Sequence, residues 1–153
     1  MHALELKVPP LAVVLIIAAA MWLASTFMPS FSLAIPWRLA FAASLAGIGV
    51  ALAAAGVLAF RSASTTVNPT TPEATSTVVA SGIYRFSRNP MYVGMLFILA
   101  GWATFLANLL PLVFLPIFVA YMNRFQIGPE ERALSARFGS EYASYLRSVR
   151  RWL

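Results

Sequence analysis

The sequence contains no cysteine, no aspartate and one histidine, His2. Without cysteine the chain can form no disulfide, thiolate nucleophile or zinc–thiolate site. A lone histidine excludes histidine-based metal sites and Ser-His-Asp catalysis as well. We therefore expect no bound metal, and any chemistry must rest on other side chains.

Charge is also scarce. Only 10% of the 153 residues are charged, 60% are hydrophobic and the mean hydropathy is +0.78. Soluble domains average about 25% charged residues, so the composition indicates a membrane protein of one domain. The net charge of +6 in so apolar a chain favours contact with anionic lipid over nucleic acid as a partner.

Four apolar runs are present, at about residues 8–28, 36–60, 91–106 and 110–127. About 20 helical residues cross a ~30 Å hydrocarbon core, so each run predicts a span, the last two rather short. The alternative for the first run, a signal peptide, is disfavoured by its length, its weakly basic flank and the second span that follows at once.

After the fourth run, apolar residues recur every three to four positions on one face and arginines occupy the other, which is typical of an interfacial helix. We predict an all-α integral membrane fold with four transmembrane helices and a C-terminal amphipathic interfacial helix. The single domain, 1–153, divides into a two-helix hairpin (1–60), a cytoplasmic loop (61–90), a helical hairpin (91–127) and the interfacial helix (128–153).

Local signals place the helix ends. Asn89-Pro90 suits a helix start, since Asn is a preferred cap and Pro a preferred first residue. We expect Pro116 to kink the fourth span, Gly128-Pro129 to end it and start a new helix, and Gly139 to break that helix. Small residues repeat every four positions in the second span and suggest a helix contact: Ala43, Gly47, Ala51 and Ala55.

Arginine placement predicts the topology. Of eleven Lys and Arg residues, only Arg38 falls in a connection assigned to the outside. By the positive-inside rule both termini and the 61–90 loop are cytoplasmic, and we expect a bacterial inner membrane.

Two polar stretches bracket the 91–127 hairpin. At Arg88–Tyr92 the first amides of a helix carry positive partial charge and suit an anionic ligand; alternatively Asn89-Pro90 only caps, while the arginines reach lipid headgroups. Glu130 and Glu131 are the only adjacent carboxylates. One interpretation is that one of them accepts hydrogen bonds from a cationic or hydroxyl-bearing cofactor. The alternative is that both only stabilise a helix start, by ~0.3–1 kcal/mol. We interpret Tyr145 as part of an interfacial aromatic belt.

The order of motifs is more specific than any one of them. Ser81-Gly82-Ile83-Tyr84, then Asn89 to Gly94, a hydrophobic hairpin, then Glu130-Glu131 with Leu134 and Phe138-Gly139 resembles the catalytic half of the isoprenylcysteine carboxyl methyltransferase family, which is related to phospholipid N-methyltransferases. The resemblance covers about residues 75–150.

The resemblance implies a cytosol-facing site for S-adenosylmethionine and a lipophilic or prenylated acceptor. It assigns cofactor binding to ten residues: Ser76, Thr77, Val78, Val79, Tyr84, Asn89, Pro90, Met91, Tyr92 and Glu130. It assigns catalytic positions to Arg88, Gln126 and Glu131.

Two positions depart from the family pattern. Asn89 replaces a histidine, and Gln126 replaces the arginine that binds the acceptor carboxylate. A carboxylate acceptor would therefore lose its cationic partner, unless Arg124 or Arg88 takes the place of that arginine. The function predicted is methyl transfer to a lipophilic acceptor similar to prenylcysteine. The alternatives are phospholipid or other small-molecule methylation and a non-enzymatic membrane scaffold.

Overall fold

The computed structural model describes residues 5–31, 33–63 and 76–153, and within these ranges the chain is helical without strands. The predicted loop at 61–90 is described only at 61–63 and 76–90, and His2 lies outside the described residues. In chain order the elements are α1 (Pro10–Phe27), η1 (Pro29–Phe31), α2 (Arg38–Ser62), η3 (Gly82–Arg85), α3 (Pro90–Leu106), η4 (Leu110–Val113), α4 (Phe114–Met122), η5 (Asn123–Ile127) and α5 (Gly128–Ser148).

Three helices are long and apolar enough to cross a membrane: α1 with 18 residues, α2 with 25, and the 39-residue helical stretch Leu110–Ser148. Helix α3 is apolar but has only 17 residues. At 1.5 Å per residue it is about 25 Å long, short of the ~30 Å core. Many large apolar side chains of α1 and α2 are exposed, which suits a surface in contact with lipid.

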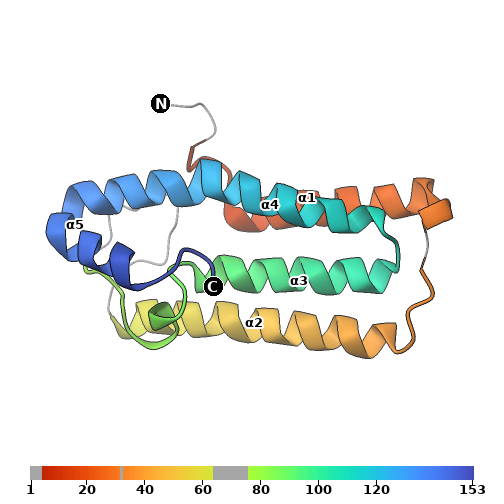
Figure 1. Ribbon diagram of the computed structural model, residues 1–153, viewed down its shortest axis with the longest axis horizontal. Helices are drawn as coiled ribbons and strands as arrows, with labels where there is room; N and C mark the ends of the chain where they lie inside the picture. Colours follow the sequence, from red (N-terminus) through yellow and green to blue (C-terminus); the bar gives the residue numbers. More distant parts are fainter. Residues whose placement is uncertain (1–4, 32, 64–75) are drawn as a thin grey trace.

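The four apolar helices run side by side along the long axis of the molecule (Figure 1). Helix α2 packs chiefly on α3, and α1 packs on α3 and α4. The α1–α2 and α3–α4 connections lie at one end of the bundle. Helix α5, η3 and the C-terminal segment lie at the other, so this second end gathers the polar motifs (Figure 1).

Glycines set the close packing of α2 on α3. A Cβ on Gly49 would lie 2.5 Å from the Gly94 carbonyl oxygen, and one on Gly94 would lie 2.5 Å from the Gly49 oxygen. The backbones therefore touch where neither residue has a side chain. The predicted stripe Ala43–Ala55 is the wrong one: a Cβ on Gly47 would meet nothing within 4 Å. A helix that is apolar all round does not reveal by its sequence which stripe meets a partner.

The expected break at Gly128-Pro129 is also corrected. A new helix, α5, begins at Gly128, but it continues α4 through a π-helical turn, η5. Pro129 has no amide hydrogen for the Phe125 carbonyl. The Leu6 amide donates to that oxygen instead, at 3.0 Å. The proline thus produces a π turn rather than an end.

Pro116 lies in the first turn of α4, after the 3-10 turn η4, where a proline is tolerated. The fourth apolar run therefore departs from α-helical geometry in η4 and in η5, and not within α4 at Pro116. The predicted break at Gly139 is confirmed: this residue has φ +52° and ψ −119°, and the chain folds back there. Figure 1 shows the resulting hairpin at the polar end of the bundle.

Candidate functional site

The start of α3 forms one wall of the site. Asn89 is the N-cap residue and Pro90 follows it, as predicted. The Asn89 side chain, however, makes no capping bond; its Nδ2 donates to the Arg151 carbonyl at 2.9 Å. The Asn89 carbonyl accepts the Tyr92 and Val93 amides, both at 3.0 Å. The first turn is thereby fixed against the C-terminal segment.

The start of α5 forms the opposite wall and brings Glu130 to Tyr92. The Tyr92 hydroxyl donates to Glu130 Oε1 at 2.5 Å across 38 residues of sequence. This hydrogen bond joins the two polar motifs that bracket the hairpin. A short bond from a phenol to a carboxylate fixes the orientation of the carboxyl group.

Glu130 has unusual electrostatics for a carboxyl. The pKa of Glu130 is raised from 4.5 to about 8: burial is the main cause of the rise, the Tyr92 hydrogen bond opposes it, and the neighbouring charge of Glu131 adds to it. Buried carboxyls resist ionisation because a low-dielectric environment disfavours the charged form. A cation bound beside this group would restore the carboxylate.

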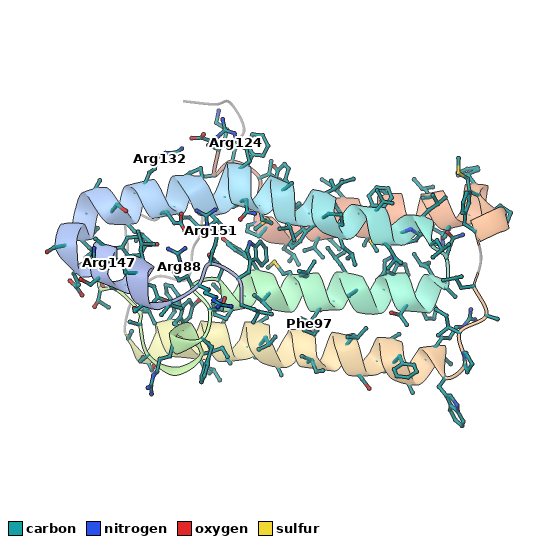
Figure 2. The ribbon with its side chains drawn as sticks, viewed as in Figure 1. Arg88, Phe97, Arg124, Arg132, Arg147 and Arg151 are labelled. Atoms are coloured by element: carbon teal, nitrogen blue, oxygen red, sulfur yellow. The ribbon has the colours of Figure 1, made fainter. Side chains whose placement is uncertain are left out.

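Glu131 points to a different partner set. Its Oε1 accepts from Arg151 Nε at 3.1 Å and its Oε2 from Arg151 Nη2 at 2.5 Å. Arg88 Nη2 lies 3.4 Å from Glu131 Oε1, and Arg88 Nε is buried without a hydrogen-bond partner among the residues that the structure describes. Figure 2 shows Arg88 and Arg151 close together inside the α5 hairpin. Two guanidinium groups thus share one carboxylate, and Arg88 keeps an unused donor.

Three tyrosines line the same region. Tyr145 is 9% exposed and donates to the Tyr84 carbonyl at 2.8 Å. Its assignment to an aromatic belt is therefore wrong, because the hydroxyl serves an internal contact. Burial raises the pKa of Tyr145 to about 12 against the opposing effect of Arg88. Burial also raises the pKa of Tyr84 and Tyr142, and Glu130 contributes to both shifts.

Gln126 faces away from this cluster toward the start of α1. It is 1% exposed, and its Nε2 donates to the Val8 carbonyl at 2.6 Å, whereas its Oε1 is buried and has no hydrogen-bond partner in the described part of the chain. The Oε1 atom can accept a hydrogen bond. Arg124, the suggested substitute, binds Glu5 at 3.2 Å.

The remaining predicted residues lie on the α2 side. Ser76 to Val79 form an irregular segment that leads to η3, and Val79 is buried. Met91 packs on Gly56 of α2, where a Cβ would lie 2.5 Å from Met91 Cγ. Tyr84 packs edge-on against Phe60 with ring centroids 5.2 Å apart. The roles assigned to these residues stay predictions.

Sequence reasoning missed Arg151, which touches both walls of the site. The pattern placed the terminal arginines on a solvated face, and periodicity carries no signal for a side chain beyond the end of a helix. It also missed Glu5, which pairs with Arg124 and, at 2.7 Å, with Arg132. That contact holds the N-terminal segment on the α4–α5 junction.

The polar groups of the site suit a ligand that carries both a cationic and an anionic group. Glu130 offers an enclosed carboxyl for a cation, and the unused Nε of Arg88 offers a donor for an anionic group. An orphaned buried donor and a carboxyl with a raised pKa are typical of ligand sites.

Comparison with known proteins identifies a family. The family model described as phospholipid methyltransferase matches residues 37–141. An uncharacterized protein of Haemophilus influenzae is 44% identical over 63 residues, which are 41% of this chain and all of that relative. No solved structure matches.

Proposed function

This chain belongs to the phospholipid methyltransferase family, and we propose that it transfers a methyl group from S-adenosylmethionine to a lipophilic acceptor at the membrane surface. The family indicates a membrane methyltransferase. The cofactor, the acceptor and the residue roles are the proposal.

The contact between Tyr92 and Glu130 carries the proposal. It unites the two motifs that the resemblance assigns to the cofactor, and it places an enclosed carboxyl beside a helix start. Tyr92, Glu130, Asn89 and Tyr84 would hold the cofactor together with the backbone of 76–79. The unused donor of Arg88 would take an anionic group of the cofactor or the acceptor.

S-adenosylmethionine, when bound, supplies a methyl group activated by a sulfonium. The side chains of the chain then need only bind, orient and exclude water, because in-line displacement at carbon requires no covalent enzyme intermediate. Holding two reactants in line can supply about 7–11 kcal/mol. This division of labour suits a chain without cysteine or aspartate.

We also propose the membrane arrangement. The four apolar helices span the bilayer, α3 shallowly, and α5 lies at the interface with the exposed arginines toward water and lipid headgroups. The basic end of the bundle faces the cytoplasm of a bacterial inner membrane, where the cofactor is made. Figure 1 supports this, since the segments carrying most arginines gather at that end.

Two acceptor classes remain. A lipophilic carboxylate similar to prenylcysteine would need a cation, and Arg88 has a donor to spare. A phospholipid amine would need a hydrogen-bond acceptor in the site, and the Oε1 of Gln126 does not supply one, since this side chain faces the start of α1. Neither Gln126 nor Arg124 offers a free cationic group, which weighs against the carboxylate.

Methyl-labelled S-adenosylmethionine tests the function and the acceptor together. Purified protein is incubated with extracted membrane lipid, and the organic phase is counted for label before and after mild alkali. We expect label in the extract for the wild type and a large loss for Glu130→Gln. Label released as volatile methanol identifies an ester, whereas alkali-stable label identifies an amine. No transfer to any lipid fraction would contradict the proposal.

A further inference from the structure

The last residues of the chain cross the site after α5 ends at Ser148. The Arg150 carbonyl accepts the Arg88 amide at 2.9 Å, and the Arg151 carbonyl accepts Asn89 Nδ2 at 2.9 Å. Trp152 Nε1 donates to Asn123 Oδ1 in η5 at 3.0 Å. The segment 149–152 therefore contacts both the approach to α3 and the π turn that precedes α5.

Arg151 stands at the centre of these contacts. Its guanidinium binds Glu131 through Nε and Nη2, at 3.1 and 2.5 Å. A two-point bond to a carboxylate fixes geometry as well as charge. The same residue's carbonyl holds Asn89. One residue thus joins the first turn of α5 to the cap of α3.

We infer that Arg151 is the positioning residue of the proposed methyltransferase site: it fixes the start of α5 against the start of α3 and so sets Glu130 opposite Tyr92. The inference rests on the proposed function for its catalytic meaning. Glu130 is the neighbour of Glu131 on α5, so a shift of Glu131 moves Glu130 as well. Arg88 could not replace this two-point bond, because it makes a single, longer contact with Glu131, at 3.4 Å.

Arg151 also controls charge at the site. Neutralising Glu131 limits its repulsion of Glu130, whose pKa that repulsion raises. The other groups with a charge effect in this cluster are Tyr84 from η3, Tyr92 from α3, Tyr142 and Tyr145 from α5, and Arg88. All of these groups remain in the chain when the Arg151 side chain is shortened, so we expect the loss of its guanidinium to appear as a shift in the pH profile of cofactor binding.

Arg150 provides a matched control. It is the adjacent residue with the same charge, its side chain is exposed, and within the described residues that side chain has no hydrogen bond or ion pair. Its contact with Arg88 is through the carbonyl, which Arg150→Ala keeps. Arg151→Lys keeps the charge of Arg151 but loses the two-point bond.

The test compares Arg151→Ala, Arg151→Lys and Arg150→Ala by calorimetry with S-adenosylmethionine across pH. We expect Arg151→Ala to bind S-adenosylmethionine about tenfold more weakly, the size of one lost charge-assisted hydrogen bond. We also expect the midpoint of the pH dependence of this binding to move to higher pH. Arg151→Lys should keep the wild-type midpoint at intermediate affinity. Arg150→Ala should match the wild type.

Amide hydrogen exchange on the ligand-free proteins supplies a second readout. We expect faster exchange at the Arg88 amide in Arg151→Ala and in Arg151→Lys, but not in Arg150→Ala. If the Arg151 and Arg150 variants exchange alike and share one pH midpoint, the inference is overturned. A wild type that binds no cofactor would refute the proposed function, and the exchange data would still decide whether Arg151 holds the site.

Discussion

At the residue scale, the site depends on one carboxyl that is reluctant to ionise. Glu130 combines burial, a phenol donor and a neighbouring negative charge. Glu131, one residue later, is neutralised by two arginines. Two adjacent glutamates thus have different environments, and the resemblance, which assigned only the first to the cofactor, distinguishes them in the same way.

The raised pKa of Glu130 should make stability depend on pH. The unfolded chain releases this proton near pH 4.5, whereas the folded chain holds it until about pH 8. The folded state therefore binds more protons between these values, and its stability falls as pH rises through this window. We expect the fall in melting temperature between pH 5 and 9 to be smaller in Glu130→Gln than in the wild type.

Glu141→Gln is the control, because Glu141 is an exposed carboxyl on the same helix. It should follow the wild-type pH dependence. A Glu130→Gln profile parallel to the wild type would mean that the carboxyl is ionised in the folded protein well below pH 8.

The same ionisation should govern the preference for a cation. S-adenosylmethionine carries a sulfonium and S-adenosylhomocysteine does not, and they are otherwise alike. Above about pH 8 the carboxylate form predominates and attracts the sulfonium. We expect the ratio of the two affinities, measured by competition, to favour S-adenosylmethionine more strongly at pH 9 than at pH 6.5. Glu130→Gln should flatten that ratio, and a wild-type ratio independent of pH would count against the assignment.

At the scale of elements, the α2–α3 pair positions the start of α3. A Cβ on Gly94 would lie 2.5 Å from the Gly49 oxygen and 2.9 Å from the Ala53 nitrogen, both backbone atoms that cannot turn aside. We expect Gly94→Ala to lower stability by about 1–3 kcal/mol through overpacking. Thermal unfolding in detergent measures this.

Gly47→Ala is the matched substitution in the same helix pair, since a Cβ there would meet nothing within 4 Å. It should be neutral or slightly stabilising, because alanine favours a helix. Equal losses of stability from both variants would contradict the close-packing account, because only the Cβ at residue 94 meets backbone atoms.

The sequence predicted elements better than contacts. The Asn89-Pro90 start and the Gly139 break follow from local backbone chemistry and were confirmed. The glycine pair at 49 and 94 was not predicted, because α2 is apolar on every side. The π turn at 123–127 had a sequence cause in Pro129, but proline alone does not tell a break from a bulge.

In the candidate site, too, the sequence predicted the motifs but not their contacts. Its motifs were visible in sequence, yet the Tyr92–Glu130 bond spans 38 residues and depends on where two helices meet. Gln126 was expected to face the acceptor, whereas its amide reaches Val8. Tertiary packing decides such orientations, and a periodic pattern contains no information about them.

At the scale of the whole molecule, the arrangement predicts an asymmetric orientation in the bilayer. We expect reporter fusions at Leu153 and within residues 28–36 to report opposite sides, with Leu153 in the cytoplasm, because of the arginine asymmetry. An Arg38→Ala variant should keep this topology. A C-terminus outside the cytoplasm would separate the site from the cofactor and contradict the enzymatic proposal.

The most direct test of the central claim is a calorimetric titration of the purified protein with S-adenosylmethionine, without any acceptor. The account predicts micromolar binding, on the order of −7 to −8 kcal/mol. Glu130→Gln should weaken it by roughly 10–150-fold, as expected for a lost charge-assisted contact. Glu131→Gln should weaken it less. A folded wild type that binds no cofactor, or equal losses from both glutamates, would contradict the account.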